Sequence, residues 1–246
     1  MSHRLIHNLL LLLILFVCAH AHAQVGEVRN DLTVGLSGGY LLNKVSFNPT
    51  IKQYMKGGET FGLTVRYTCE KYFSAICSIQ AEVNYANMGW KENIEYRTAD
   101  NEHDSYERDM HYIQIPVFAR MAWGREVRGA QFFFQVGPQL SYCMSEEEHL
   151  SGPWDASTLN QRPNHVTQQY DLDVQRKFEY GLTGGLGVEL SSKVGRFSLE
   201  GRYYYGLSDI FNNGKQDPFG RSANGTIVVK AGYLFDIIRT KGITRK

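Results

Sequence analysis

Three patterns in the 246-residue sequence predict an all-β chain folded as an eight-stranded antiparallel up-and-down transmembrane β-barrel. Apolar residues alternate with small or polar residues over eight segments, and no window of similar length shows the period of an amphipathic helix. The connections between segments are alternately long and short, as in barrels with extended loops on one rim and tight turns on the other. Each segment has about 10–14 residues, which suits a tilted membrane crossing.

The expected strands are defined by this alternation and lie at about residues 32–41, 59–69, 75–88, 110–122, 130–143, 178–190, 196–206 and 224–236. The long connections follow every second strand and cover about residues 42–58, 89–109, 144–177 and 207–223. Pro116 lies within the fourth segment and cannot donate a ladder hydrogen bond, so we expect a local bulge or irregularity there.

The N-terminus predicts export through a cleaved signal peptide over residues 1–23. Arg4 supplies the positive charge, residues 9–17 are an unbroken apolar run, and Ala21-His22-Ala23 matches a cleavage site. A membrane anchor is disfavoured, because nine apolar residues are about half of what a helix needs to span a bilayer. The bulky Val17 before Cys18 also fits poorly with a lipoprotein signal.

The remaining residues, 24–246, are predicted to form a single barrel domain that ends in a short basic periplasmic tail, residues 237–246. The chain contains 26 Lys and Arg residues and 25 Asp and Glu residues. It therefore has no excess of positive charge that would attract nucleic acid. No apolar run after residue 23 approaches the ~20 residues of a membrane-spanning helix.

Alternation alone does not say which set of side chains faces outward. In a soluble barrel that binds a ligand, the apolar set would line the cavity and the polar set would face water. The polar set here is mostly Gly, Ser, Thr and Gln, whereas a solvated surface is richer in Lys and Glu. Aromatic residues near the strand ends also predict two interfacial girdles, one with Tyr40, Trp90, Tyr142, Tyr203 and Tyr205, the other with Tyr67, Trp123, Phe197, Tyr233 and Phe235. These features favour the membrane barrel.

An eight-stranded barrel has an interior only wide enough for side chains to fill it. Charged residues of the inward set are expected to pair there, because an isolated buried charge is costly. This predicted lumen network contains Arg66, Glu82, Arg120, Glu189, Glu200, Arg202 and Lys230. A structural network that plugs the lumen is one interpretation, and a narrow gated ion path is the alternative.

Cys69 and Cys77 flank a tight turn and fall on the same outward face, so a disulfide between them is predicted in an oxidising compartment. Their spacing does not match a zinc site, and no His lies near them. Neither HExxH nor GxSxG occurs, and the glycines of residues 181–187 lack the Gly-Lys-Ser/Thr of a phosphate-binding loop. We therefore expect no catalytic residues, metal or cofactor.

The connection at about residues 144–177 is the longest in the chain and contains Trp154 and Tyr170. Long loops without secondary structure are uncommon unless they have a function. The loop is a candidate external binding surface, and steric shielding of the barrel mouth is the simpler alternative.

Four motifs, in order along the chain, resemble one known family. They are HYIQIPVFAR from His111 to Arg120, Gly137-Pro138, the glycine-rich segment 181–187 and Arg202-Tyr-Tyr-Tyr-Gly-Leu207. Over about residues 30–236 the chain is similar to the PorT-like, "porin family" outer-membrane β-barrel domains of Bacteroidota.

The resemblance implies an integral protein of the bacterial outer membrane with a structural role or a binding role exerted through its loops, and without catalysis. Its partners would be outer-membrane lipid and other envelope or secretion proteins that contact the external loops. The alternatives are a subunit of a secretion or transport assembly, and a narrow channel. One departure is that the chain continues past Phe235 with DIIRTKGITRK, whereas many outer-membrane proteins end on an aromatic residue.

Overall fold

The computed structural model describes residues 26–92, 105–150, 167–170 and 172–239. The predicted signal peptide and residues 240–246 of the basic tail lie outside the described residues. Every regular element in the described part is a β-strand. None of these residues forms a helix long and apolar enough to cross a membrane.

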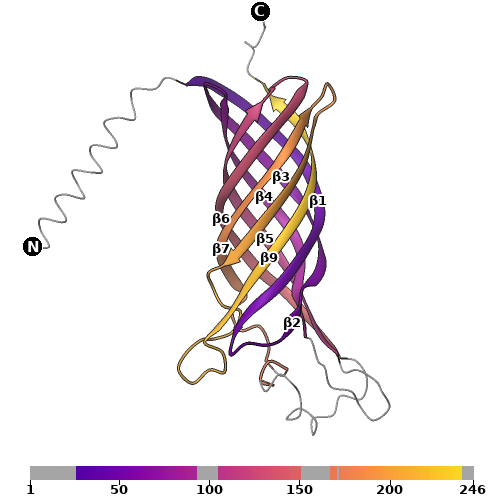
Figure 1. Ribbon diagram of the computed structural model, residues 1–246, viewed down its shortest axis with the longest axis vertical. Coiled ribbons are helices and arrows are strands. Elements are labelled where there is room, and N and C mark those ends of the chain that lie inside the picture. The colour runs from indigo at the N-terminus through magenta and orange to yellow at the C-terminus, as the bar shows by residue number, and fades with distance from the viewer. Residues whose placement is uncertain (1–25, 93–104, 151–166, 171, 240–246) are drawn as a thin grey trace, which may run out of the picture.

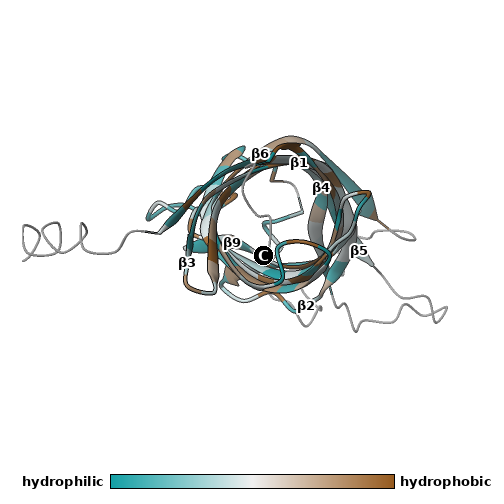
Figure 2. Ribbon diagram, turned by 90° about the horizontal axis from the view of Figure 1, so that it is seen from above, coloured by the Kyte–Doolittle hydropathy of each residue, from teal (hydrophilic) through white to brown (hydrophobic). Residues whose placement is uncertain are grey.

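Eight long strands form a ring in which each strand runs antiparallel to its two neighbours (Figures 1 and 2). The ring follows the order β4-β3-β1-β9-β8-β7-β6-β5 and closes because β4 also pairs with β5. A ninth, two-residue strand, β2, pairs with β4. The strand bounds are β1 (Glu27–Asn48), β2 (Gln53–Tyr54), β3 (Lys56–Tyr72), β4 (Ala75–Glu92), β5 (Tyr106–Gly124), β6 (Gly129–Leu150), β7 (Phe178–Ser191), β8 (Arg196–Gly206) and β9 (Arg221–Ile238). The eight predicted segments each fall within one long strand.

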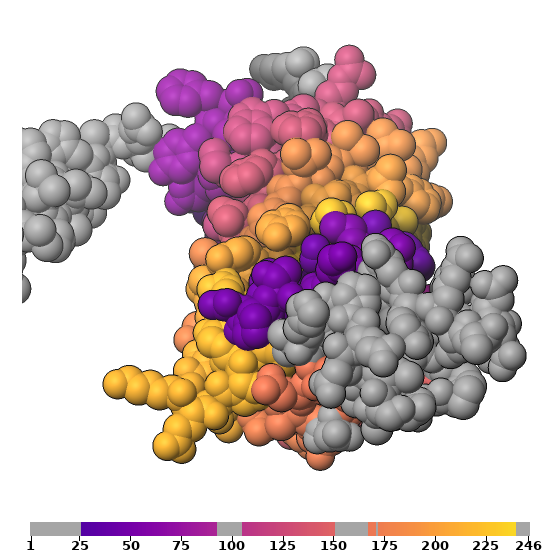
Figure 3. Space-filling model, turned by 60° about the horizontal axis from the view of Figure 1, so that its bottom comes forward, coloured from indigo at the N-terminus to yellow at the C-terminus, as the bar shows by residue number. Residues whose placement is uncertain are grey.

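The two ends of the ring differ in how the strands are joined. Short turns at residues 73–74, 125–128 and 192–195 lie at one end, together with the start of β1 and the end of β9. We call this the turn end, which is uppermost in Figure 1. The opposite loop end carries the long connections, and Figure 3 looks onto it, with β1 (indigo) beside β9 (yellow).

The apolar set of side chains faces outward around the middle of the ring. Leu36 and Leu63, for example, are 60% and 58% exposed, although both lie in the centres of long strands. Soluble monomers rarely expose an apolar surface as extensive as this belt. The exposure of the apolar set rules out the soluble barrel with an apolar cavity, and it fits a surface in contact with lipid.

Several strands extend beyond the predicted segments at the loop end. There the apolar side chains lie on the inward face of the strand and the polar ones on the outward face. On β1, Leu36 and Tyr40 face outward within the apolar belt, whereas beyond it Lys44 faces outward and Val45 and Phe47 are buried. The alternation keeps its period, but the outer surroundings change from lipid to water, so apolar side chains now point inward. The prediction required apolar residues on the outward face, so it ended the first strand at residue 41.

Trp90 corrects one detail of the predicted girdles. Its side chain is fully buried and points inward, because it shares its face of β4 with Asn84 and Met88. The irregularity predicted at Pro116 is present, as a gap in strand pairing and not as a bulge. The β4–β5 pairing skips the residues around Pro116 and resumes without a change of register.

Candidate functional site

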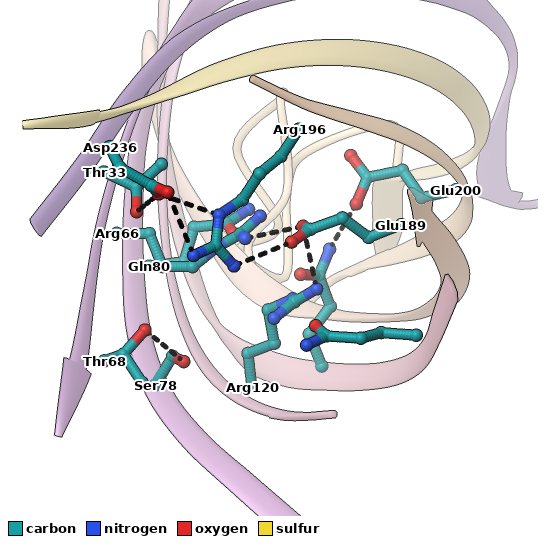
Figure 4. Close-up of polar contacts among 12 residues, drawn as sticks. Thr33, Arg66, Thr68, Ser78, Gln80, Arg120, Glu189, Arg196, Glu200 and Asp236 are labelled. Atoms are coloured by element: carbon teal, nitrogen blue, oxygen red, sulfur yellow. Dashed lines mark hydrogen bonds and ion pairs between the residues drawn. The ribbon is translucent and has the colours of Figure 1, made fainter. Parts of the chain in front are cut away.

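A buried cluster around Glu189 occupies the interior toward the turn end (Figure 4). One oxygen of Glu189 accepts hydrogen bonds from Arg66 at 2.6 Å and Arg120 at 3.0 Å. Its other oxygen lies 3.4 Å from Arg196, which also bonds to Asp236 at 2.8 Å. One fully buried carboxylate thus contacts three guanidinium groups, so its negative charge is central to this part of the interior.

A second cluster lies near the middle of the barrel. Arg202 forms two hydrogen bonds with Glu82, at 2.8 and 2.6 Å, and a third with Glu200 at 2.5 Å. Lys230 lies 3.1 Å from the same Glu82 carboxylate. Gln135 donates to Glu200 at 2.9 Å. The bidentate geometry and the additional donors satisfy charges that would otherwise be costly to bury.

Gln80 connects the two clusters. It accepts a hydrogen bond from Arg66 at 2.8 Å and donates one to Glu82 at 2.6 Å. We call the whole assembly the ion network, and all seven charged residues predicted for the lumen are buried members of it. The prediction missed Arg196, although it shares its inward-facing side of β8 with Glu200 and Arg202, because it is the first residue of the strand.

A layer of polar side chains separates the ion network from the loop end. Glu179 is fully buried there and accepts hydrogen bonds from Tyr112 and from Asn224. Asn43 donates to Asn224 at 2.9 Å and accepts from Thr226 at 2.5 Å. Glu179 was also missed, although its inward direction follows from its spacing of ten residues from Glu189 on β7.

The interior at the loop end is an aromatic core. Phe47 lies 5.3 Å from Trp90 and 5.2 Å from Phe219, measured between ring centroids, and Phe211 stacks on Phe219 at 5.4 Å. Phe211 and Phe219 belong to the connection between β8 and β9. We call this group, which also contains Tyr106, Tyr112 and Tyr170, the loop-end core. It anchors a long connection to the ends of the strands.

Arg108 fixes a second connection to the loop-end core. Its guanidinium lies 5.1 Å from the centre of the Trp90 ring and forms an ion pair with Glu146 at 3.0 Å. It also donates to the backbone carbonyls of Leu172 at 2.7 Å and Gln169 at 3.2 Å. A single buried cation therefore joins β4, β5, β6 and the segment before β7. Sequence reasoning gave no indication of this role.

Tyr170 requires a correction to the predicted binding loop. Its ring is buried and packs against Tyr106 with a centroid distance of 4.9 Å, and its hydroxyl donates to Glu92 at 2.7 Å. It therefore belongs to the loop-end core and is inaccessible to an external ligand. The other candidate, Trp154, lies outside the described residues.

The predicted disulfide is not formed in the structure, where Cys69 and Cys77 are free thiols. The strand register gives the reason. Thr68 pairs with Ser78 and Glu70 pairs with Cys77, so a register shift leaves Cys69 without a residue directly opposite.

The interior is closed as far as the described residues define it. A cavity of about 10 Å³ lies beside Arg66 and Arg120, and one of about 20 Å³ lies beside Tyr204 and Lys230. Each has room for about one water molecule. Within the same residues, no group of three or more His, Cys, Asp or Glu side chains is arranged to hold a metal ion.

The family model described as "Outer membrane protein beta-barrel domain" matches residues 22–212, which is most of the chain and includes strands β1 to β8. The chain belongs to this family. This outer-membrane β-barrel therefore has its lipid-facing surface at the apolar belt, and the bacterial outer membrane is its location.

Solved structures that match most of this chain include three bacterial proteins. Neisserial surface protein A is 11% identical with a TM-score of 0.45, and the match covers 84% of this chain and 97% of that one. OprG from Pseudomonas aeruginosa is 13% identical with a TM-score of 0.40, covering 85% and 98%. Ail, the attachment invasion locus protein of Yersinia pestis, is 13% identical with a TM-score of 0.36, covering 85% and 99%.

These three TM-scores are low, and the family assignment rests on the family model. Among proteins with curated functions, none matches the sequence significantly.

An ion-pair cluster at the loop end, beyond the apolar belt, predicts that stability depends on pH. Lys56 lies 2.7 Å from both Glu107 and Asp109. Burial alone would raise the pKa of Asp109, but the hydrogen bond and the charge of Lys56 hold it below its ordinary value. Asp109 therefore stabilises the fold above its ordinary pKa, and this contribution is lost as the pH falls through the lowered pKa.

We expect Asp109→Asn to lower the free energy of unfolding by about 0.5–1 kcal/mol relative to the wild type near neutral pH. This is the range for an ion pair that solvent partly screens. The difference should shrink as the pH is lowered to about 3, because the wild-type carboxyl is then increasingly protonated. Urea unfolding of both proteins across this range provides the measurement. A difference that stays constant with pH would contradict the assignment.

Proposed function

We propose that the protein is a non-conducting, non-catalytic outer-membrane barrel of the PorT-like group of Bacteroidota, exported through a cleaved signal peptide, whose loop end binds a partner. One observation carries the proposal. The strands continue beyond the apolar belt, and the interior of this extension is a packed aromatic core to which two long connections are anchored. A channel has no need of such a core, whereas a binding surface benefits from connections held on a rigid support.

The contacts of the loop end support a rigid platform. Phe211 and Phe219 attach the β8–β9 connection to the core, and Arg108 attaches the segment before β7. Few backbone conformations then remain to be fixed when a partner binds, so binding costs less conformational entropy.

We assign no catalytic role to the two described histidines of the loop end. His111 is hydrogen bonded to Tyr85 at 2.6 Å, and His149 lies 3.2 Å from Asp109. Neither contact joins a histidine to a serine or cysteine nucleophile in a catalytic arrangement.

Planar-bilayer recording tests the closed interior. We expect the purified, folded protein to produce no discrete conductance steps, because the ion network and the loop-end core fill the interior in series. Steps that vanish on substitution of Arg66 or Glu82 would contradict the proposal and support the narrow channel. Stoichiometric co-purification with several envelope proteins would instead favour a subunit of a secretion or transport assembly.

A further inference from the structure

A pocket of about 500 Å³ opens at the turn end, and it is far larger than the two described cavities of the interior. Three segments form it: the β5–β6 turn, the β7–β8 turn and the end of β9. We call it the rim pocket. Arg196 and Asp236 of the ion network line it, and no residue of the loop-end core does.

The rim pocket has an excess of positive charge. Its lining contains the carboxylates Glu126 and Asp236, and its basic residues are Arg128, Lys193, Arg196 and Arg239. Both carboxylates are matched by cations at short distance. Glu126 lies 2.6 Å from Lys71 and 3.2 Å from Arg29, and Asp236 lies 2.8 Å from Arg196.

Two basic residues of the pocket lack such partners. Within the described part of the chain, no ion pair joins Arg128 or Lys193 to a carboxylate. Arg128 also occupies a left-handed backbone position with φ 47°, which is unfavourable for an arginine. These two cations are available to an anion that enters the pocket.

The outer wall of the rim pocket is apolar. Val194 is 69% exposed and Phe235 is 43% exposed, and both line the pocket. Phe235 contacts Tyr233 at a centroid distance of 4.6 Å, and Tyr233 contacts Phe197 at 4.8 Å. Aromatic residues grouped in this way mark the boundary between lipid and water. The pocket therefore lies at the level of lipid headgroups, with basic residues and apolar residues side by side.

We propose that the rim pocket binds the phosphate group of an anionic phospholipid from the membrane leaflet on the turn side. Arg128 and Lys193 contact the phosphate, since guanidinium and ammonium groups are the side chains that recognise it. The acyl chains extend along Phe235 and Val194. A soluble phosphate ester offers the same anionic group but makes no use of the apolar wall.

Native mass spectrometry of the folded, detergent-solubilised protein tests this assignment. Phosphatidylglycerol and phosphatidylcholine with identical acyl chains are the probes. We expect the wild-type protein to retain phosphatidylglycerol preferentially. Combining Arg128→Gln with Lys193→Gln should reduce its retention about fivefold or more, while retention of phosphatidylcholine is unchanged.

The matched control combines Lys44→Gln with Lys215→Gln, which removes the same charge from exposed positions outside the pocket. The boiling-dependent shift in gel mobility establishes that each variant is folded. Equal retention of the two lipids by the wild type would overturn the proposal, as would equal losses in the two double variants. Competition by glycerol phosphate at the same concentration as the lipid would overturn the lipid as the source of the phosphate.

Discussion

Replacing Glu189 with Gln is expected to destabilise the barrel by about 3–5 kcal/mol, the cost of leaving buried charges without their counterion. The substitution keeps the shape of the side chain but removes the only carboxylate that forms an ion pair with Arg120 among the described residues. Arg66 retains its hydrogen bond to Gln80, and Arg196 retains Asp236. Urea unfolding in lipid vesicles, with the boiling-dependent gel shift reporting the folded fraction, measures the effect.

Two further variants show that the effect arises from charge. Glu147→Gln makes the same chemical change at an exposed position on β6 and should alter stability by less than about 0.5 kcal/mol. Adding Arg120→Met to Glu189→Gln removes the buried cation that loses its counterion. The double variant should therefore recover a large part of the lost free energy of unfolding. If the free energy of unfolding of the Glu189→Gln protein lies within about 1 kcal/mol of the wild-type value, the ion network does not need this carboxylate for stability.

Trp90→Ala is expected to loosen the loop end, at a cost of about 3–5 kcal/mol for truncation of a large buried aromatic side chain. The substitution removes the ring contacts with Phe47 and Phe211 and the surface over which Arg108 lies. In the described part of the chain, the ring contacts of Trp90 are with the loop-end core and Arg108, so the ion network and the lipid-facing belt should remain folded. We therefore expect the transmembrane part to keep its boiling-dependent gel shift while the loop end opens more often.

Limited proteolysis measures this opening. Trypsin should cleave after Arg176 and Lys177, in the segment held by Arg108, about tenfold faster or more than in the wild type. Tyr54→Ala is the matched control, because Tyr54 is an exposed aromatic residue of β2 at the same end. Equal cleavage of the Trp90→Ala and wild-type proteins would mean that the loop-end core does not hold the connections in place.

The sequence by itself determined the antiparallel strands, their order, the two kinds of connection and the inward direction of the lumen charges. These features follow from local rules. Side chains alternate with period two in any strand, and antiparallel neighbours can be joined by short turns. Each of the seven predicted lumen residues is buried for this reason. The inward direction of Glu179 and Arg196 follows from the same alternation. Both residues were missed because they lie close to strand ends.

Only the tertiary structure decided what lies at the two ends of the barrel. Past the apolar belt the surroundings change from lipid to water, so apolar side chains point inward there and outward within the belt. The sequence does not mark where this change happens. Trp90 was therefore predicted on the outward face, but it is buried in the loop-end core. Tyr170 was predicted in an external binding loop, and it is buried in the same core. Its residues come from strands and connections far apart in the chain, and the rim pocket likewise joins three separate segments. Which residues meet there depends on the closure of the ring, because local periodicity fixes the direction of a side chain and leaves its long-range neighbours undetermined.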